Sequence, residues 1–469
     1  MKYTLPLPQI LERHADLIHE VLPEEIKEAR CLLILKALAN HRIKVESSTM
    51  SIGPSVSLLT VKLAEGQSYR SAKFLQDDIA ISTGCKGMRF ILSEDGLGIE
   101  YANRSRSIVP LRSLLESSAY VETNAELPVA IGYSVSQRIK VIDLVETPHI
   151  LMAGATKQGK TIAVNTLVAS LLFRKSPDDL KFVFIDPTSV ELCAFQELRG
   201  DYFAWVPYSE GEDNERSNYI VKGIITADKV LRSLCLEMEE RLKEERRHPY
   251  IVTIINEFAD LTMSPDKVLS NNIYRSIISI LQKGKQAGIH LVLTTQRPSA
   301  DVITGLLKSN ITTRMAFRTS SRRDSSVILD QAGAEKLIGN GDMLFQSGYD
   351  IERIQGGYIS NAEIVRLITA INDQVDRAPV SPYYLPEGQV ESVPNKYDDR
   401  LEEAAYIVVL LQIASVSHLQ KKMGIGNGRA KRIMEQLEGF GIVGPLEKGH
   451  LIRNVQVKTI DELRIILEQ

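Results

Sequence analysis

The segment that most constrains the fold reads GATKQGKT and runs from Gly154 to Thr161. It matches the pattern GxxxxGK[ST] in full and lies between an apolar run ending at Ala153 and a helix-forming run, Ile162–Phe173. A loop in this position turns its backbone N–H groups onto phosphates at a helix N-terminus, where the helix dipole favours anions. The segment therefore predicts a P-loop, with ATP as its ligand, inside an α/β domain.

Two side chains of the P-loop have expected roles toward the nucleotide. Lys160 is expected to reach the β- and γ-phosphates, and the hydroxyl of Thr161 is expected to bind Mg²⁺. A chance glycine-rich turn is the alternative, but phosphate binding requires the strand, loop and helix found here. The residues expected to contact the nucleotide are Gly154, Ala155, Thr156, Lys157, Gln158, Gly159, Lys160 and Thr161.

A second polar site follows the apolar strand IVTIIN. Nucleotide-hydrolysing sites usually place an aspartate there for the Mg²⁺ water shell and a glutamate that polarises the attacking water. Glu257 supplies the glutamate, unless it is an ordinary strand-end carboxylate, whereas the aspartate position holds Asn256. Because carboxylates orient the waters of Mg²⁺, slow hydrolysis is expected, and Asn256→Asp is expected to accelerate it.

Polar residues also end two neighbouring apolar strands. Gln296 follows HLVLTT and is expected to sense the γ-phosphate, with simple turn formation as the alternative. Asp186 ends KFVFID and either orients the site or caps the next helix.

The order of apolar runs predicts several domains. The runs PHILMA, KFVFID, IVTIIN and HLVLTT are nearly continuous, as a parallel sheet covered on both faces requires, and indicate a P-loop NTPase domain over 132–376. Short alternating runs around a helix at Ser68–Thr83 predict a small α/β domain over 51–131, after an N-terminal helical segment over 1–50.

The C-terminal part has a different pattern. Residues 377–397 hold four prolines without periodicity and are expected to form a stiff linker. Residues 398–469 read helix, helix, turn, helix and two short strands, which is typical of a winged helix-turn-helix. Arg429 and Arg432 share a helix face that could enter the major groove, unless it is only a solvated surface. The residues expected to bind DNA are Lys421, Arg429, Lys431 and Arg432.

Composition excludes several classes of protein. The 469 residues have 44% hydrophobic side chains, a net charge of −3 and four cysteines without a CxxC pair, which disfavours disorder, zinc sites and disulfide frameworks. No signal peptide is recognised, and no apolar run reaches the roughly 20 residues that span a bilayer. A cytoplasmic protein without a membrane segment is expected.

These segments together resemble the soluble motor portion of the bacterial FtsK/SpoIIIE DNA translocases. The resemblance is most specific in AGIHLVLTTQRPSADVITGLLKSNITTRMAF and ILDQAGAEKLIGNGDML, and extends to an α-like domain and a winged-helix γ-like domain. It implies a homohexameric ring with a RecA-like core that uses ATP to move along double-stranded DNA. Chromosome or mobile-element segregation, with recombinase or division-machinery partners, is the implied setting.

The resemblance assigns a catalytic role to Lys285, which stands where the family has an arginine that reaches a neighbouring subunit's nucleotide. Arg314 is a further candidate for such a contact. Lysine offers a point charge rather than a planar fork, so Lys285 and Asn256 both predict slow turnover. An ATP-binding DNA organiser with little hydrolysis therefore stays open as an alternative, and a single-strand coupling ATPase is disfavoured by the duplex-reading winged helix.

Overall fold

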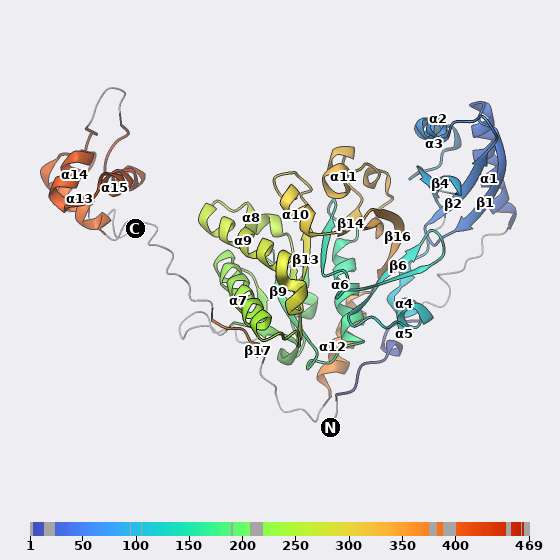
Figure 1. The fold of residues 1–469 in the computed structure, drawn as a ribbon, viewed down its shortest axis with the longest axis horizontal. Coiled ribbons are helices and arrows are strands. Elements are labelled where there is room, and N and C mark those ends of the chain that lie inside the picture. The colour runs from blue at the N-terminus through green and yellow to red at the C-terminus, as the bar shows by residue number, and fades with distance from the viewer. Residues whose placement is uncertain are drawn as a thin grey trace. The chain divides into compact units, whose positions relative to one another are not determined.

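The computed structural model describes residues 3–13, 24–93, 95–104, 106–188, 191–206, 219–374, 382–387, 400–446, 452–460 and 462–463. The chain divides into two compact units, Met1–Gly388 and Gln389–Gln469 (Figure 1).

A small antiparallel sheet forms the N-terminal part of the first unit, with strand order β1-β2-β4-β3. Its elements are α1 (Glu24–Asn40), β1 (Val45–Ile52), β2 (Val56–Leu63), α2 (Tyr69–Phe74), α3 (Gln76–Thr83), β3 (Arg89–Ser93) and β4 (Gly96–Ala102). Ile34 of α1 packs in the same core as Leu59 and Ile99 of the sheet. The boundary expected at residue 51 falls inside β1, because the helix and the sheet share this core.

The main sheet has the order β11-β9-β12-β13-β8-β14-β15-β16-β6-β7, with β5 beside β16. The four apolar runs form parallel neighbours in it, as the sequence predicts, and β14 to β7 continue it with antiparallel pairs. Its strands are β5 (Val109–Pro110), β6 (Pro128–Ser134), β7 (Ile139–Asp143), β8 (His149–Ala153), β9 (Leu180–Ile185), β11 (Ile220–Val221), β12 (Tyr250–Ile255), β13 (Ile289–Thr295), β14 (Thr313–Phe317), β15 (Asp342–Ser347) and β16 (Asp350–Tyr358).

Helices cover both faces of this sheet (Figure 1). Along β8, Ile150 and Met152 face one core with helices α4, α6 and α12, while Leu151 faces the opposite core with α7 and α9. These helices are α4 (Leu111–Leu115), α6 (Lys160–Leu172), α7 (Ile224–Lys243), α9 (Lys267–Lys283) and α12 (Asn361–Asn372). Helix α4 and strand β6 pack in the same core as Ile150 and Met152. The domain boundary expected at residue 132 therefore falls inside β6.

Part of the expected linker is docked on the first unit. β17 (Tyr383–Tyr384) pairs in parallel with β10 (Ala204–Trp205), and Leu385 is buried behind it. The hydroxyl of Tyr383 donates to buried Glu237 at 2.5 Å. The stiff, extended linker expected over 377–397 is thus packed against the first unit at Tyr383–Leu385. Positions 377–381 and 388–397 of that linker lie outside the described residues.

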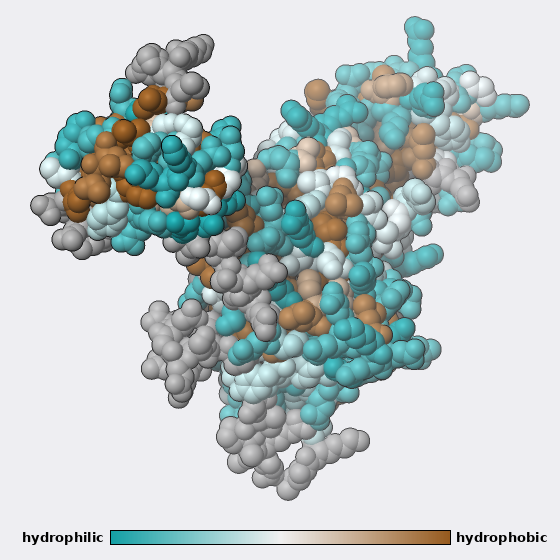
Figure 2. Space-filling view, turned by 60° about the vertical axis from the view of Figure 1, so that its left-hand side comes forward, coloured by the Kyte–Doolittle hydropathy of each residue, from teal (hydrophilic) through white to brown (hydrophobic). Residues whose placement is uncertain are grey.

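The second unit is a compact winged helix. α13 (Leu401–Leu411), α14 (Val416–Met423) and α15 (Asn427–Gly439) pack around a core of their own. The two expected strands appear as single antiparallel bridges, Ala414↔Arg453 and Val443↔Val455. Hydrophobic and hydrophilic side chains both reach the surface of this unit (Figure 2).

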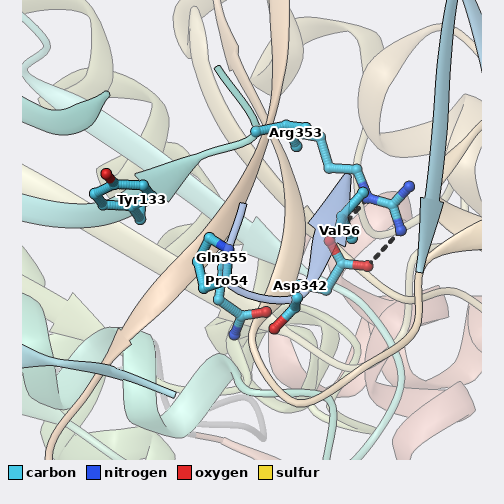
Figure 3. A pocket seen from close by; sticks show the side chains of 8 residues that line it. Pro54, Val56, Tyr133, Asp342, Arg353 and Gln355 are labelled. Atoms are coloured by element: carbon cyan, nitrogen blue, oxygen red, sulfur yellow. Dashed lines mark hydrogen bonds and ion pairs between the residues drawn. The ribbon is translucent and has the colours of Figure 1, made fainter. Parts of the chain in front are cut away.

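A buried ion network joins the small sheet to the main sheet. Arg353 of β16 is 2% exposed and donates to both oxygens of Asp342 on β15, at 3.0 and 2.8 Å (Figure 3). The same guanidinium lies 3.4 Å from the carboxylate of Glu100 on β4 and donates to the carbonyl of Gly87. A pocket of about 10 Å³ beside it has room for a single water molecule.

Removing Arg353 should destabilise the first unit. Arg353→Met leaves the buried carboxylate of Asp342 without its cation, whereas Glu100 keeps its pair with Arg89. A loss of about 3–5 kcal/mol is expected, measured as a shift in the urea midpoint. Lys336→Ala is the control, because Lys336 pairs with exposed Asp77 and should cost about 1 kcal/mol or less. Equal midpoints for Arg353→Met and the parent would contradict the stabilising role of this network.

Candidate nucleotide site and DNA-binding helix

The P-loop follows β8 and leads directly into α6, which begins at Lys160. Two of its glycines are required by close backbone contacts as well as by positive φ angles. A Cβ on Gly159 (φ 117°) would lie 2.7 Å from the backbone of Gly341, and one on Gly154 (φ 151°) would lie 2.8 Å from Phe317. The loop is therefore held against neighbouring strands in a shape that side chains would block.

Lys160 is buried and bonded to the loop that contains it. Its Nζ donates to the carbonyls of Gly154 at 2.6 Å and Ala155 at 2.8 Å. Burial lowers the pKa of Lys160 to about 8, although Glu191 and Glu257 oppose this shift. A cation held among the loop carbonyls is a suitable partner for a phosphate anion.

Glu257 and Gln296 lie at the same edge of the sheet as the P-loop. The Glu257 carboxylate accepts hydrogen bonds from the Thr295 hydroxyl and from the backbone N–H of Gln296, both at 2.7 Å. The Gln296 side chain in turn accepts a 2.6 Å bond from the hydroxyl of Thr156 in the P-loop. The structure thus brings together three residues that the sequence singled out, Lys160, Glu257 and Gln296.

The backbone of Glu257 is also unusual. Its φ and ψ of 44° and 58° are left-handed, a conformation that costs a non-glycine residue on the order of 1–3 kcal/mol and clusters at functional sites. The hydroxyl of Thr294 accepts from its backbone N–H at 3.2 Å, which helps to hold this turn. The carboxylate direction is therefore set by both backbone and side-chain contacts.

The side-chain amide of Asn256 is hydrogen-bonded at both its nitrogen and its oxygen. Its amide nitrogen donates to Asp186 at 3.0 Å, and its oxygen accepts from the Thr294 hydroxyl at 2.7 Å. Since both ends of the amide are engaged inside the protein, the expected place of Asn256 at the metal is not supported. Its polar atoms serve instead to join β12 to the ends of β9 and β13.

Asp186 both orients the site and caps the next turn. Its fully buried carboxylate accepts from Asn256 and from the backbone N–H groups of Glu191 and Leu192, at 3.0 and 3.1 Å. Burial alone would raise the pKa of Asp186, but the hydrogen bonds, with Thr188 and Asn256 foremost, outweigh it and hold the pKa below its usual value. The carboxylate is therefore stable in its charged form.

Glu191 is the site residue that sequence analysis missed. Its carboxylate is close enough to Thr161, Lys160 and Glu257 for each of them to affect its pKa. Burial raises the pKa of Glu191, and Thr161 and Lys160 work against that change. The only sequence signal is its position soon after the strand KFVFID, which gives no hint of this contact.

Lys285 lies away from the P-loop of its own chain. It is in the short turn Gly284–Ala287 before β13, and its Nζ is 3.4 Å from exposed Glu146. Because β13 and β8 are parallel neighbours, with Leu291 opposite His149, the turn lies at the other edge of the sheet. Five residues of strand separate these edges by about 17 Å. The position excludes a direct role at this chain's own P-loop.

The guanidinium of Arg314 is hydrogen-bonded to residues of its own chain. It is buried, and its guanidinium donates to the carbonyls of Lys308, Ile311 and Ile328 and to the carboxylate of Asp330. A guanidinium with four internal acceptors is not available to a neighbour's nucleotide. The internal bonds of Arg314 do not favour the expected contact with a neighbouring subunit.

The winged-helix unit presents the basic residues as the sequence predicts for a surface helix. α15 buries Ala430 and Ile433 in the core, whereas Lys431 and Arg432 are exposed and Arg429 is partly exposed. Lys421 is exposed on α14. The packing of α15 therefore turns its charged side chains outward.

Among the residues that the structure describes, no helix combines the length and apolarity needed to cross a bilayer. The same part of the chain contains no group of three His, Cys, Asp or Glu side chains able to hold a metal alone. Mg²⁺ at nucleotide sites commonly relies on one or two protein oxygens together with phosphates, and the Thr161 hydroxyl and Glu191 carboxylate fit that need.

Asn256→Asp should destabilise the protein near neutral pH, rather than simply supply a missing charge. It would set a second carboxylate beside Asp186, so one of the pair should titrate above its unfolded pKa of about 3.9. The folded state then binds the extra proton, so the loss is absent below about pH 4 and grows as pH rises toward the raised pKa. The expected cost is about 1.4 kcal/mol per pKa unit, measured as urea midpoints across this pH range.

The exchange variant Asp186→Asn/Asn256→Asp is the control. It restores one amide beside one carboxylate and should recover most of the stability lost in Asn256→Asp. If Asn256→Asp alone were as stable as the parent at neutral pH and hydrolysed ATP faster, the result would support the expectation from the sequence that a carboxylate at position 256 accelerates hydrolysis.

Comparisons with known proteins agree over most of the chain. Residues 110–201 and 210–300 match the FtsK/SpoIIIE family, residues 5–103 the FtsK alpha domain and residues 395–458 the FtsK gamma domain. DNA translocase FtsK of Haemophilus influenzae is 33% identical over 96% of this chain and 92% of its own length. DNA translocase SftA of Bacillus subtilis is 36% identical over 93% of this chain and 46% of its own length.

A solved structure of the conjugation coupling protein TcpA of pCW3, in its monomer form with ATPγS, is also similar. It is 20% identical, covers 72% of this chain and 99% of its own, and superposes with a TM-score of 0.47. The chain spans nearly all of the Haemophilus influenzae relative and about half of the Bacillus subtilis one. Because identity above 30% extends over nearly the full length of both chains in the first comparison, the chain belongs to the FtsK/SpoIIIE family.

Proposed function

We propose that this chain is an ATP-dependent motor that moves along double-stranded DNA as a ring, in the segregation or transfer of chromosomal or mobile-element DNA. The observation that supports this most is a pair of hydrogen bonds at one edge of the sheet. Thr156 of the P-loop donates to Gln296, and Thr295 donates to Glu257 at the end of the neighbouring strand. The relatives named DNA translocase FtsK and SftA support the same function.

Each site residue has a proposed role in ATP hydrolysis. Lys160 binds the phosphates, and Gln296, bonded to the P-loop, responds to the γ-phosphate. Glu257 polarises the attacking water, because its carboxylate is oriented by two donors at the same edge of the sheet. Mg²⁺ beside Thr161 would neutralise developing phosphate charge when bound.

The ring is supported by the position of Lys285. This lysine lies at the edge of the sheet opposite the P-loop, where a subunit packed head to tail would present its own nucleotide. Such an interface forms a closed ring when its rotation closes, and a homohexamer is the proposed form. The small N-terminal domain, the motor domain and the winged helix are the proposed parts of each cytoplasmic subunit.

DNA recognition is proposed for the winged helix. Arg429 and Arg432 lie three residues apart on α15 and would contact base edges in the major groove, where arginine pairs with guanine. Lys421 and Lys431 would contact phosphates, since their exposed ammonium groups carry charge without a fixed planar shape. An organiser that binds DNA and ATP but hardly hydrolyses it is the second candidate, favoured by the uncharged amide of Asn256.

DNA-stimulated ATPase of the full chain tests the proposal. Lys160→Ala should lose at least about tenfold in ATP affinity and all stimulation, because a charge-assisted hydrogen bond is worth about 1.5–3 kcal/mol. Duplex binding through the winged helix should persist, and Lys243→Ala, an exposed lysine on α7, should behave as the parent. A parent that binds both DNA and ATP without turnover would favour the organiser.

Mixing two inactive variants tests the ring. Lys285→Ala removes the proposed contact to a neighbour, and Glu257→Gln removes the group that polarises water. In a mixture, some interfaces pair the intact Glu257 of one subunit with the intact Lys285 of the next, so ATPase should return. Each variant alone should bind nucleotide but stay inactive. Absence of recovery at every mixing ratio would argue against action between subunits.

A further inference from the structure

A carboxylate that does not come from β12 lies beside the P-loop threonine. The carboxylate of Glu191 is close enough to Thr161, Lys160 and Glu257 for each of them to affect its pKa. Asn256 has both amide ends occupied, by Asp186 and Thr294. The carboxylate beside the P-loop threonine is therefore supplied by the segment after β9.

The position of Glu191 is set by a continuous set of buried hydrogen bonds. Its backbone N–H donates to Asp186 at 3.0 Å, and the next N–H, of Leu192, donates to the same oxygen at 3.1 Å. The other Asp186 oxygen accepts from the Asn256 amide. A neutral amide can donate to Asp186, which an ionised aspartate cannot do. Asn256 therefore supports the turn that carries Glu191.

We propose that Glu191 is the positioning residue for the Mg²⁺ water shell beside Thr161, in the place of the carboxylate that Asn256 lacks. Mg²⁺ keeps several of its waters and is held through one or two carboxylates together with phosphates. The inference rests on the proposed function, because it assigns one residue of the same ATP site. It also explains how the chain can hold Mg²⁺ with an amide at position 256.

A purely structural role for Glu191 makes a different prediction. If Glu191 only balanced the charge of Lys160, its loss would alter nucleotide affinity equally with and without Mg²⁺. If it orders the Mg²⁺ waters, its loss changes the Mg²⁺ requirement and leaves affinity in a chelator unchanged. The metal dependence of binding therefore separates the two roles without reference to turnover.

The experiment measures binding of a fluorescent ATP analogue to the full chain, first in EDTA and then over a Mg²⁺ titration. Glu191→Gln should raise the Mg²⁺ concentration for half-maximal tightening by about 10–100-fold, the usual effect of losing an outer partner of a metal. Affinity in EDTA should match the parent, which also shows that the variant folds. Glu191→Asp should keep part of the Mg²⁺ response.

Glu197→Gln is the matched control. Glu197 follows the same strand, its side chain is exposed, and its backbone carbonyl bonds Asn372. Its Mg²⁺ requirement should equal that of the parent. A shift as large as that of Glu191→Gln would overturn the inference, because any nearby charge would then suffice.

Two other results overturn the proposal for Glu191. One is an unchanged Mg²⁺ requirement in Glu191→Gln, and the other is an equal loss of affinity in EDTA and in Mg²⁺. A parent that binds the analogue in neither buffer would instead overturn the proposed function, and the inference with it. The parent's own binding curve thus distinguishes the two failures.

Discussion

The parallel pairing of β13 between β12 and β8 is the constraint on which the rest of the site depends. Leu293 lies opposite both Ile255 of β12 and Leu151 of β8, so the carboxyl ends of the three strands meet at one edge. The P-loop, Glu257 and Gln296 each follow one of these ends. A shift of the strand pairing by one residue would turn every side chain of the strand to the opposite face of the sheet. The hydrophobic cores on both faces of the sheet therefore fix the register.

The polar contacts at that edge form a connected set rather than isolated pairs. Asp186, Asn256 and Thr294 are bonded across three strands in a region closed to water. Buried polar groups are tolerated only when their partners are present, and an amide between a hydroxyl and a carboxylate satisfies both neighbours. The uncharged amide of Asn256 is therefore bonded to the carboxylate of Asp186, and the site still contains acidic groups.

The small sheet and the P-loop contact one common segment of the main sheet. Gly341 donates its N–H to the carbonyl of Gln158 at 2.9 Å, and the next residue, Asp342, binds Arg353. Arg353 also bonds Gly87 beside the small sheet. The buried charges that attach the N-terminal domain thus lie one residue from a contact with the nucleotide loop. This proximity follows from the tight turn before β15, where Gly341 has a φ of 85°.

Sequence alone determined the P-loop, the four parallel strands and the helical order of the winged helix, because glycine spacing and apolar periodicity are local properties. It also placed Lys160, Glu257 and Gln296 at one site, since parallel strands end at the same edge. Only the tertiary structure decided the partners of Asn256, the proximity of Glu191 to Thr161, the internal bonds of Arg314 and the docking of Tyr383. Each of these depends on which distant residue lies nearby, and that is set by long-range packing rather than by neighbouring residues in the chain.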